Sequence, residues 1–323
     1  MICCAIVGTS WISEEFYAAS LCSDMVLCGV CSRSEEKGRA FAQKIGRPEV
    51  EIFTSVEALA ASPDIDAVYV ASPNSCHAPQ CAILLGAGKH VLCEKPVTAC
   101  PPQLEHLQAL ARRQGLVFME AIMYLHTPAH RAVKEALESS ALGKITSAHL
   151  DFSQLSSRYG QLRAGEVPNV FNPAMAAGAW NDLGVYCVYP ALDFFGDPLE
   201  FTAQMHLLPT GADGSGTAML RYAAFPVTLT WSKLGQSQGV SQIMGDEGTL
   251  TIRSISQFQD VTLYDRQGNA RALAQPLQKH EVMGYEARAF CDYIIGQEPA
   301  VPYEEASELS LRVARWMERA RGN

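Results

Sequence analysis

Several features are missing from this sequence of 323 residues, and each absence excludes a class of protein. No apolar run reaches the about 18 residues of a membrane-spanning helix, and no basic segment precedes the first apolar run, so we expect neither a membrane anchor nor a secretory signal. Lysine and arginine do not cluster, and the net charge is -9, which argues against nucleic acid or an anionic membrane as partner. A small molecule is the expected ligand.

Internal repeats and low-complexity tracts are also absent. Cysteine, in contrast, is frequent. The count of 11 cysteines is odd, and most of them lie within apolar runs, as buried reduced thiols do. This pattern favours a reducing compartment, so we expect a soluble protein of the cytoplasm. Cys28 and Cys31 have the spacing of a redox or zinc pair, but residues i and i+3 of a strand point to opposite faces. A structural role is therefore favoured for them.

Short apolar runs alternate with helical patterns through the first 120 residues. The runs predict strands over 2–7, 25–31, 52–53, 67–71, 91–93 and 117–119. Helical patterns fill the intervals, over 13–20, 34–45, 55–60, 77–87 and after Thr98. This alternation predicts a doubly wound parallel sheet, an α/β dinucleotide-binding domain over residues 1–120.

Residues 121–323 have a different pattern and predict a second, α+β domain that binds substrate and forms oligomers. From Glu200 to Asp265 the chain reads as short strands with glycine-rich turns, which indicates an antiparallel sheet. One face of this sheet is expected to take helices. The other is expected to form a subunit interface, with strand positions Phe201, Met205, Tyr222 and Trp231. We expect the last two helices, 285–295 and 304–321, to return toward the first domain.

The turn after the first strand reads Gly8-Thr9-Ser10-Trp11-Ile12-Ser13 and opens a helix. A dinucleotide fingerprint, G-x-G-x-x-G/A, belongs at this place, but only its first glycine is present. Ser10 can still donate its hydroxyl to a phosphate, and the helix N-terminus supplies amide groups. A plain strand-to-helix turn is the alternative.

The second strand ends at Ser32-Arg33, where an acidic residue would bind the ribose 2′-hydroxyl of NAD. A small polar residue followed by arginine instead leaves room for a 2′-phosphate and neutralises it, so NADP is the preferred cofactor and NAD the second choice. Two alternatives stay open: Arg33 is a solvated surface residue, or it stacks on the adenine and serves both cofactors alike.

Two further polar turns follow strands of the same sheet. Ser72-Pro73-Asn74 and His77 come after the fourth strand, where serine and asparagine also serve as helix caps. The fifth strand leads into Glu94-Lys95-Pro96. Ligands bind at the carboxyl edge of an open parallel sheet, so Lys95 is a candidate functional residue and not merely an exposed lysine.

A carboxylate and a phenol stand together in the second domain. Asp182 and Tyr186 lie four residues apart in an apolar helical segment, which puts them on one helix face, where both need polar partners. A cluster of Lys95, Asp182 and Tyr186 accounts for all three side chains.

Four segments together resemble the glucose-fructose oxidoreductase, inositol dehydrogenase and rhizopine-catabolism (Gfo/Idh/MocA) family. They are the Gly8 turn and residues 72–77, 88–96 and 181–186, and the resemblance covers essentially the whole chain. The Glu-Lys-Pro and Asp-x-Gly-x-Tyr segments are its most specific parts. The sequence departs from the family pattern in two places. Two of the fingerprint glycines are missing, and Tyr186 stands where many members have histidine. Tyrosine at this position resembles the branch of glucose-fructose oxidoreductase and of dihydrodiol or xylose dehydrogenase.

The resemblance implies a Rossmann domain that carries NADP or NAD, followed by a domain built on a large, mostly antiparallel open sheet. It implies hydride transfer at a sugar, polyol or cyclic diol carbon, in a homodimer or homotetramer. The alternative is a member that has lost catalysis and serves as an NADP(H)-binding sensor or regulatory subunit, which the missing glycines favour and the retained Lys95, Asp182 and Tyr186 disfavour.

The resemblance also implies roles for individual residues. Tyr186 would protonate or deprotonate the reacting oxygen, Lys95 would lower the pKa of Tyr186, and Asp182 would hold a substrate hydroxyl. Substrate-binding residues are expected to be Tyr124, Asn181, Asp182 and Tyr186. Cofactor-binding residues are expected to be Gly8, Ser10, Trp11, Ile12, Ser32, Arg33, Ser72, Pro73, Asn74, His77, Glu94 and Lys95.

Two other features of the second half bear on function. His126 and His130 have metal-ligand spacing, but no acidic third ligand stands nearby, so we expect no metal site. Residues 153–172 form a long polar loop, and Arg158, Tyr159 and Arg163 are candidates to cover the substrate.

Overall fold

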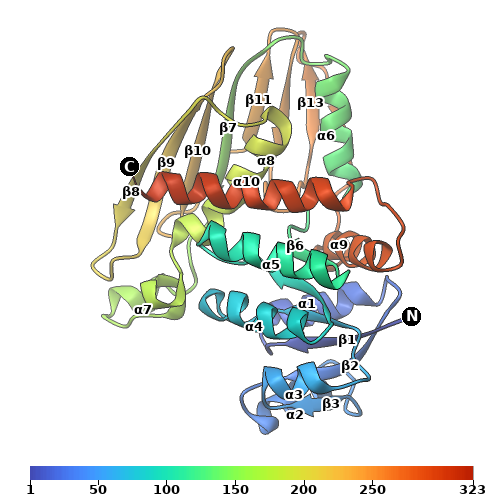
Figure 1. Cartoon of the computed structure of the whole chain (residues 1–323). Coiled ribbons are helices and arrows are strands. Elements are labelled where there is room, and N and C mark those ends of the chain that lie inside the picture. Colours follow the sequence, from blue (N-terminus) through green and yellow to red (C-terminus); the bar gives the residue numbers. More distant parts are fainter. Residues whose placement is uncertain (323) are drawn as a thin grey trace. The chain divides into compact units, whose positions relative to one another are not determined.

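The computed structural model describes residues 1–322 and divides them into two compact units (Figure 1). Unit 1 contains Met1–His126 and Gln278–Glu308, and unit 2 contains Thr127–Leu277 and the chain from Leu309 onward. Each unit has its own sheet, so each is described by itself.

Unit 1 is built on a six-stranded parallel sheet in the order β3-β2-β1-β4-β5-β6. The strands are β1 (Ile2–Val7), β2 (Met25–Cys31), β3 (Glu51–Phe53), β4 (Ala67–Val70), β5 (His90–Glu94) and β6 (Phe118–Ala121). From β1 the chain adds β2 and β3 on one side and then β4, β5 and β6 on the other, so the strand order switches between β1 and β4, the place where such sheets bind dinucleotides. The predicted doubly wound parallel sheet is therefore confirmed.

Helices cover this sheet and follow the predicted alternation. They are α1 (Trp11–Ser20), α2 (Glu35–Lys44), α3 (Val56–Ala61), α4 (Asn74–Gly86), α5 (Pro101–Gln114) and α9 (Lys279–Ile294). Ser55 caps α3 as its sequence indicates, accepting a hydrogen bond from the Ala58 amide at 3.1 Å. Helix α9 comes from near the C-terminus and packs along α1. Its Arg288 guanidinium donates to the Cys22 carbonyl at 3.1 Å.

Unit 2 is built on an eight-stranded sheet in the order β14-β13-β12-β11-β7-β10-β9-β8. The strands are β7 (Ile145–Ser153), β8 (Glu200–Leu207), β9 (Asp213–Arg221), β10 (Pro226–Ser232), β11 (Ser241–Gly245), β12 (Gly248–Ile252), β13 (Thr262–Asp265) and β14 (Ala270–Ala272). Only the pairing of β7 with β10 is parallel within this sheet. The expected large, mostly antiparallel sheet is confirmed.

Helices lie against one face of this second sheet. Figure 1 shows α8 (Val185–Phe195) in front of β7 and β10, and α6 (Pro128–Glu138) contacts α8 through His130 and Phe194. The second half of α10 (Tyr303–Arg321) also belongs to unit 2. The predicted loop 153–172 is shorter than expected, because it contains the helix α7 (Tyr159–Arg163) and a 3-10 turn, Asn169–Phe171.

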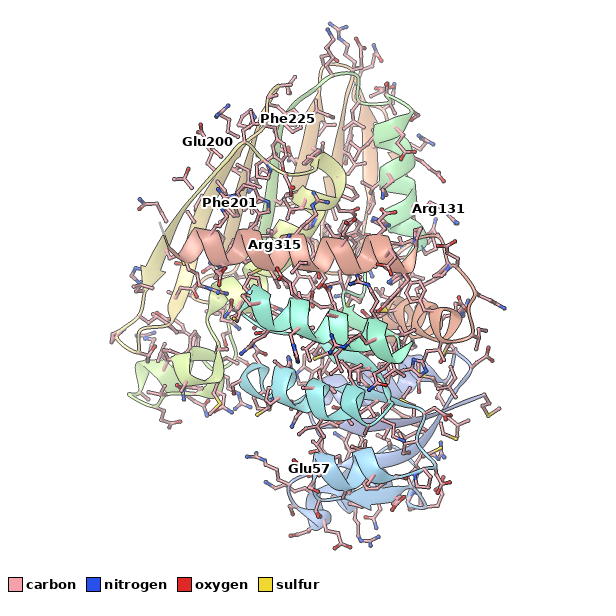
Figure 2. The ribbon with its side chains drawn as sticks, in the orientation of Figure 1. Glu57, Arg131, Glu200, Phe201, Phe225 and Arg315 are labelled. Carbon is pink, nitrogen blue, oxygen red and sulfur yellow. The ribbon has the colours of Figure 1, made fainter. Side chains whose placement is uncertain are left out.

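The predicted subunit interface is wrong for three of its four side chains. Phe201, Tyr222 and Trp231 are at most 8% exposed, because they face the helices and not the open side of the sheet. Phe201, labelled in Figure 2, meets the Trp180 ring edge-on at 6.0 Å between centroids. The open face instead carries side chains such as Thr202, Thr217 and Met219.

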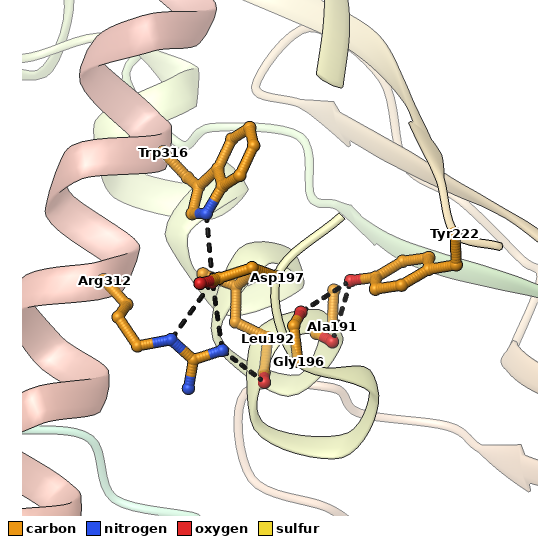
Figure 3. Close-up of polar contacts among 7 residues, drawn as sticks. All are labelled: Ala191, Leu192, Gly196, Asp197, Tyr222, Arg312 and Trp316. Carbon is orange, nitrogen blue, oxygen red and sulfur yellow. Dashed lines mark hydrogen bonds and ion pairs between the residues drawn. The ribbon is translucent and has the colours of Figure 1, made fainter. Parts of the chain in front are cut away.

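A polar cluster closes the end of α8 (Figure 3). Asp197 accepts hydrogen bonds from the Arg312 guanidinium and the Trp316 indole of α10, both at 3.1 Å. The Tyr222 hydroxyl lies within hydrogen-bond distance of two carbonyl oxygens, those of Ala191 at 3.2 Å and Gly196 at 3.1 Å. These bonds tie the sheet, α8 and α10 together, and they supply partners to the two buried polar groups of the cluster, the Tyr222 hydroxyl and the Trp316 indole.

Replacing Tyr222 by phenylalanine tests this cluster. We expect the free energy of unfolding of unit 2 to fall by about 1–2 kcal/mol, because buried carbonyl groups lose their donor. Urea denaturation measures the change, and Tyr264→Phe, at an exposed tyrosine on β13, is the matched control. Equal stability of the two variants would contradict the role given to the Tyr222 hydroxyl.

Candidate active site

The turn between β1 and α1 can receive a phosphate. Gly8 has a φ of 108°, and a Cβ there would lie 2.6 Å from the Ala71 carbonyl oxygen, so only glycine fits. Ser10 is the N-cap of α1, but its side chain accepts no hydrogen bond from the helix. Within residues 1–322 the amides of Trp11 and Ile12 also donate to no group. Amide groups at a helix N-terminus therefore remain for an anion.

Helix α9 adds a charge to this turn that the sequence did not predict. The Lys279 ammonium lies 4.1 Å from the centroid of the Trp11 ring, and Trp11 is 61% exposed. Ser13, at the third fingerprint position, is fully buried and provides the close packing that a small residue allows there. Trp11 and Lys279 thus place an exposed aromatic ring and a positive charge together beside this turn.

Ser32 and Arg33 directly follow β2, as predicted. The Ser32 amide donates to the Phe53 carbonyl at 3.0 Å, and Ser34 then caps α2. Arg33 is exposed and makes no ion pair or hydrogen bond within the described part of the chain. Its guanidinium is therefore available to an anionic ligand at this edge.

The turn after β4 differs from prediction, because α4 begins at Asn74, three residues before the expected start at His77. Pro73 is its N-cap, and the Ser72 hydroxyl donates to the Gln80 side chain at 2.6 Å. His77 is buried, with Nδ1 2.9 Å from the Pro96 carbonyl oxygen and Nε2 2.7 Å from that of Ser72. Burial lowers the His77 pKa, so the neutral ring donates to one carbonyl. His77 ties two turns of the site together; its cofactor contact stays a prediction.

Lys95 directly follows β5, at the carboxyl edge of the sheet, as predicted. The preceding Glu94 accepts a hydrogen bond from the Tyr69 hydroxyl at 2.5 Å. The Lys95–Pro96 peptide bond is cis, and the Val97 amide donates to the Glu120 carboxylate at 2.9 Å. The next helix, α5, begins at Pro101, later than the expected cap at Thr98.

A buried carboxyl group on α9 was not predicted. Glu286 is 1% exposed, and neither of its oxygens has a hydrogen-bond partner within residues 1–322. Burial raises its pKa well above the usual range, the charge of Glu94 raises it further, and Lys279 partly opposes the shift. Burial therefore favours the protonated form of Glu286 in the folded protein.

Glu286 predicts a pH dependence of stability. Its pKa is higher in the folded than in the unfolded chain, so the folded state binds more protons between the two values, and stability falls as pH rises through that window. Glu286→Gln removes this loss. We expect melting temperatures that match wild type near pH 4, about the unfolded pKa, and exceed it increasingly toward pH 8.

The control for this prediction is Glu308→Gln at an exposed position of unit 1. Its difference in melting temperature from wild type is expected to stay constant with pH. A constant difference for Glu286→Gln as well would show that Glu286 ionises normally.

In unit 2 the segment with the predicted catalytic residues departs from a regular α-helix. Residues Trp180–Gly184 form a π-helical turn that continues into α8, so Asp182 and Tyr186 span the junction. Such turns often occur at functional sites. The expected i, i+4 alignment on one continuous α-helix is therefore wrong in its local geometry, although both residues lie on adjoining turns.

Asp213, at the start of β9, anchors this π-helical turn. It accepts hydrogen bonds from the Trp180 amide at 2.7 Å and the Trp231 indole at 3.0 Å. Burial raises the pKa of Asp213, and the bonds from Trp231 and Trp180 oppose that shift. Gly178 permits the approach: its φ is 127°, and a Cβ there would lie 2.3 Å from Asp213 Oδ1.

The side chains of the turn have firm partners in unit 2. Asp182 forms a hydrogen-bonded ion pair with Lys233, the residue after β10. Tyr186 is 5% exposed, and its ring meets Phe152 edge-on at 5.4 Å. Asn181 donates to the Ala176 carbonyl at 2.9 Å and accepts from the Arg321 guanidinium. Lys233 is the polar partner that sequence reasoning missed.

Several other candidate residues are buried in the folded protein. Tyr124 is fully buried, and His130 is paired with the buried Asp193 at 2.6 Å. No group of three possible metal ligands occurs among the described residues. Burial raises the pKa of Cys28 and Cys31 to about 11, so both thiols are poor nucleophiles at neutral pH.

Comparison with known proteins decides the family. The model described as "Oxidoreductase family, NAD-binding Rossmann fold" matches residues 2–122, and the "GFO/IDH/MocA C-terminal domain" matches residues 130–251. The chain belongs to the GFO/IDH/MocA family. It is therefore an enzyme of the dehydrogenase and reductase class, and the resemblance seen in the sequence is confirmed.

Relatives within the GFO/IDH/MocA family align over most of the chain. The scyllo-inositol 2-dehydrogenase (NADP(+)) IolU of Bacillus subtilis is 37% identical over 322 residues, 99% of this chain and 96% of that protein. The trans-1,2-dihydrobenzene-1,2-diol dehydrogenase of Mus musculus is 31% identical over 256 residues, 77% and 74% of the two chains.

A solved structure shares the fold. The 3-ketoreductase KijD10 from Actinomadura kijaniata, in complex with NADP and TDP-benzene, has a TM-score of 0.86 and 28% identity, covering 99% of this chain and 97% of that one. Among residues 1–322, no helix has the length and apolar character needed to cross a membrane.

Proposed function

We propose that this oxidoreductase transfers a hydride between NADP(H) and a CH–OH carbon of a sugar, polyol or cyclic diol, with NAD as the weaker cofactor. The observation that carries the proposal is the Asp182–Tyr186 segment, where a carboxylate and a phenol lie on adjoining turns and the carboxylate is fixed by an ammonium group. The full-length similarity to an NADP-dependent inositol dehydrogenase supports this substrate class. The relatives give no support to the alternative of a silent sensor.

The chain's own groups divide the work as the family resemblance implies. Tyr186 exchanges a proton with the reacting oxygen, and the positive charge of Lys95 favours the phenolate form of Tyr186. Asp182, an acceptor while ionised, orients the substrate by taking a hydrogen bond from its hydroxyl group. The nicotinamide ring supplies the hydride chemistry when it is bound. Tyr124 and Asn181 are proposed as substrate contacts.

The first unit has groups that fit a dinucleotide. The unused amides of Trp11 and Ile12, with the hydroxyl of Ser10, suit the pyrophosphate. Ser32 and the unpaired Arg33 suit a 2′-phosphate. Proposed contacts further along the edge are Gly8, Ser72, Pro73, Asn74, His77, Glu94 and Lys95.

The proposal extends to assembly and location. We propose a homodimer or homotetramer formed through the open sheet face of unit 2, where Met219 is 56% exposed. Light scattering at micromolar concentration tests it, and a monomer contradicts it. The free state of all the cysteines fits a reducing cytoplasm.

A substrate panel tests the proposed function. Purified enzyme is mixed with NADP or NAD and with scyllo-inositol, a trans-dihydrodiol or one of a set of aldoses, and cofactor reduction is followed by absorbance; ketoses and keto-inositols test the reverse direction with NADPH. Stoichiometric turnover with at least one compound supports the proposal. Cofactor binding without turnover on any of them would favour the sensor.

The role proposed for Lys95 predicts that Lys95→Met loses catalysis. The variant keeps the apolar stem but removes the charge that favours the Tyr186 phenolate, so kcat is expected to fall by about 100-fold or more. Lys144→Met, at an exposed lysine of unit 2, is the matched control and should keep wild-type turnover. Unchanged kcat in Lys95→Met would remove Lys95 from the reaction.

Arg33→Ala tests cofactor choice. A charge-assisted contact with the 2′-phosphate is worth roughly 1.5–3 kcal/mol, so Kd for NADP should rise by about one to two decades while Kd for NAD changes little. Calorimetric titration of both cofactors measures this, with Arg113→Ala, at an exposed arginine of α5, as control. Equal losses for NADP and NAD would favour stacking of Arg33 on the adenine.

A further inference from the structure

The Lys233 ammonium has more donors than the structure uses. Lys233 is 5% exposed, and its only side-chain partner within residues 1–322 is the Asp182 carboxylate. An ammonium group carries three N–H donors, and water reaches this one poorly. Buried polar groups are usually satisfied, so donors left over beside a catalytic carboxylate indicate a ligand that supplies an acceptor.

The backbone holds Lys233 in a fixed place. Its amide donates to the Gly214 carbonyl at 2.8 Å, and its own carbonyl accepts from the Ser156 amide at 2.9 Å. The preceding Ser232 accepts at its Oγ from the amides of Leu234 and Gly235, both at 3.1 Å. These backbone hydrogen bonds fix the position of Lys233 at the end of β10, as is needed for a residue that discriminates between ligands.

The two side chains of the Asp182–Lys233 ion pair differ in solvent exposure. The Asp182 side chain is 37% exposed, and the Lys233 side chain 6%. A buried ammonium needs a counter-charge, so Lys233 keeps Asp182 ionised and fixes its orientation. An ionised carboxylate only accepts hydrogen bonds, whereas the ammonium only donates them. A single hydroxyl group of a ligand matches this arrangement, because it can donate to the Asp182 carboxylate and accept from the Lys233 ammonium.

We propose that Lys233 is a specificity-determining residue that, with Asp182, binds the hydroxyl group next to the reacting carbon. This inference rests on the proposed function and deepens it: the substrate class is a vicinal diol within a sugar or cyclic polyol. Tyr186 exchanges the proton at the reacting oxygen, and the Asp182–Lys233 pair selects the substrates that carry a second hydroxyl beside it.

The test compares two probes: the panel polyol with the highest kcat/KM, and the same polyol with hydrogen in place of the hydroxyls on both carbons next to the reacting one. Wild type should prefer the full polyol by at least about 100-fold, because unpaired buried polar groups penalise the deoxy analogue. Lys233→Met should reduce that ratio at least about 10-fold and leave Kd for NADP unchanged, and Lys233→Arg should restore part of the ratio.

An unchanged ratio in Lys233→Met, with turnover retained, overturns the inference and leaves the proposed function standing. Absence of turnover by wild type on the whole panel is a failure of the proposed function, and the inference falls with it.

A second measurement tests the pairing without turnover. Asp182→Asn strands a buried ammonium and should lower the melting temperature, and adding Lys233→Met should recover part of the loss. Strictly additive changes in melting temperature would show that the two side chains do not depend on each other, and would overturn the inference.

Discussion

The buried carboxylate of Asp213 is the constraint on which the second unit's site depends. It joins the start of β9 to the Trp180 amide and the Trp231 indole, and so fixes the π-helical turn to the sheet. Because Asp182 and Tyr186 lie on that turn and the next one, their positions follow from this anchor. The ion pair of Asp182 with Lys233 adds a second attachment, from the end of β10. Asp182 and Tyr186 are thus held from the start of β9 and the end of β10.

Much of the fold could be predicted because its signals are local. The alternation of short apolar runs with helical patterns gave the parallel sheet of unit 1, and glycine-rich turns between short strands indicated the antiparallel sheet of unit 2. Lys95 and Arg33 could be placed because each directly follows a strand of a parallel sheet, and such residues share one edge. Helix starts were less accurate: α4 begins at Asn74 and α5 at Pro101, because proline at or beside the N-cap shifted both.

The missed features depend on contacts between distant parts of the chain. Glu286 and Lys279 reach the first sheet only because α9 packs on α1, which no local pattern indicates. The π-helical turn depends on Asp213, more than 30 residues further along the chain. Phe201, Tyr222 and Trp231 were assigned to the wrong face, since alternation shows that a face is apolar but not what covers it. Lys233 did leave a signal: it follows Leu229 and Trp231 at a spacing of two, on the buried face of β10.

Transfer of deuterium from cofactor to substrate tests the central claim most directly. NADPH carrying deuterium at the transferable position of nicotinamide C4 is incubated with the enzyme and the ketone form of its best substrate, and the product is examined by mass spectrometry and NMR. The account predicts one deuterium on the carbon that becomes CH–OH and none in the solvent. Product without deuterium, or NADPH that is bound and never oxidised, would contradict a hydride-transferring oxidoreductase.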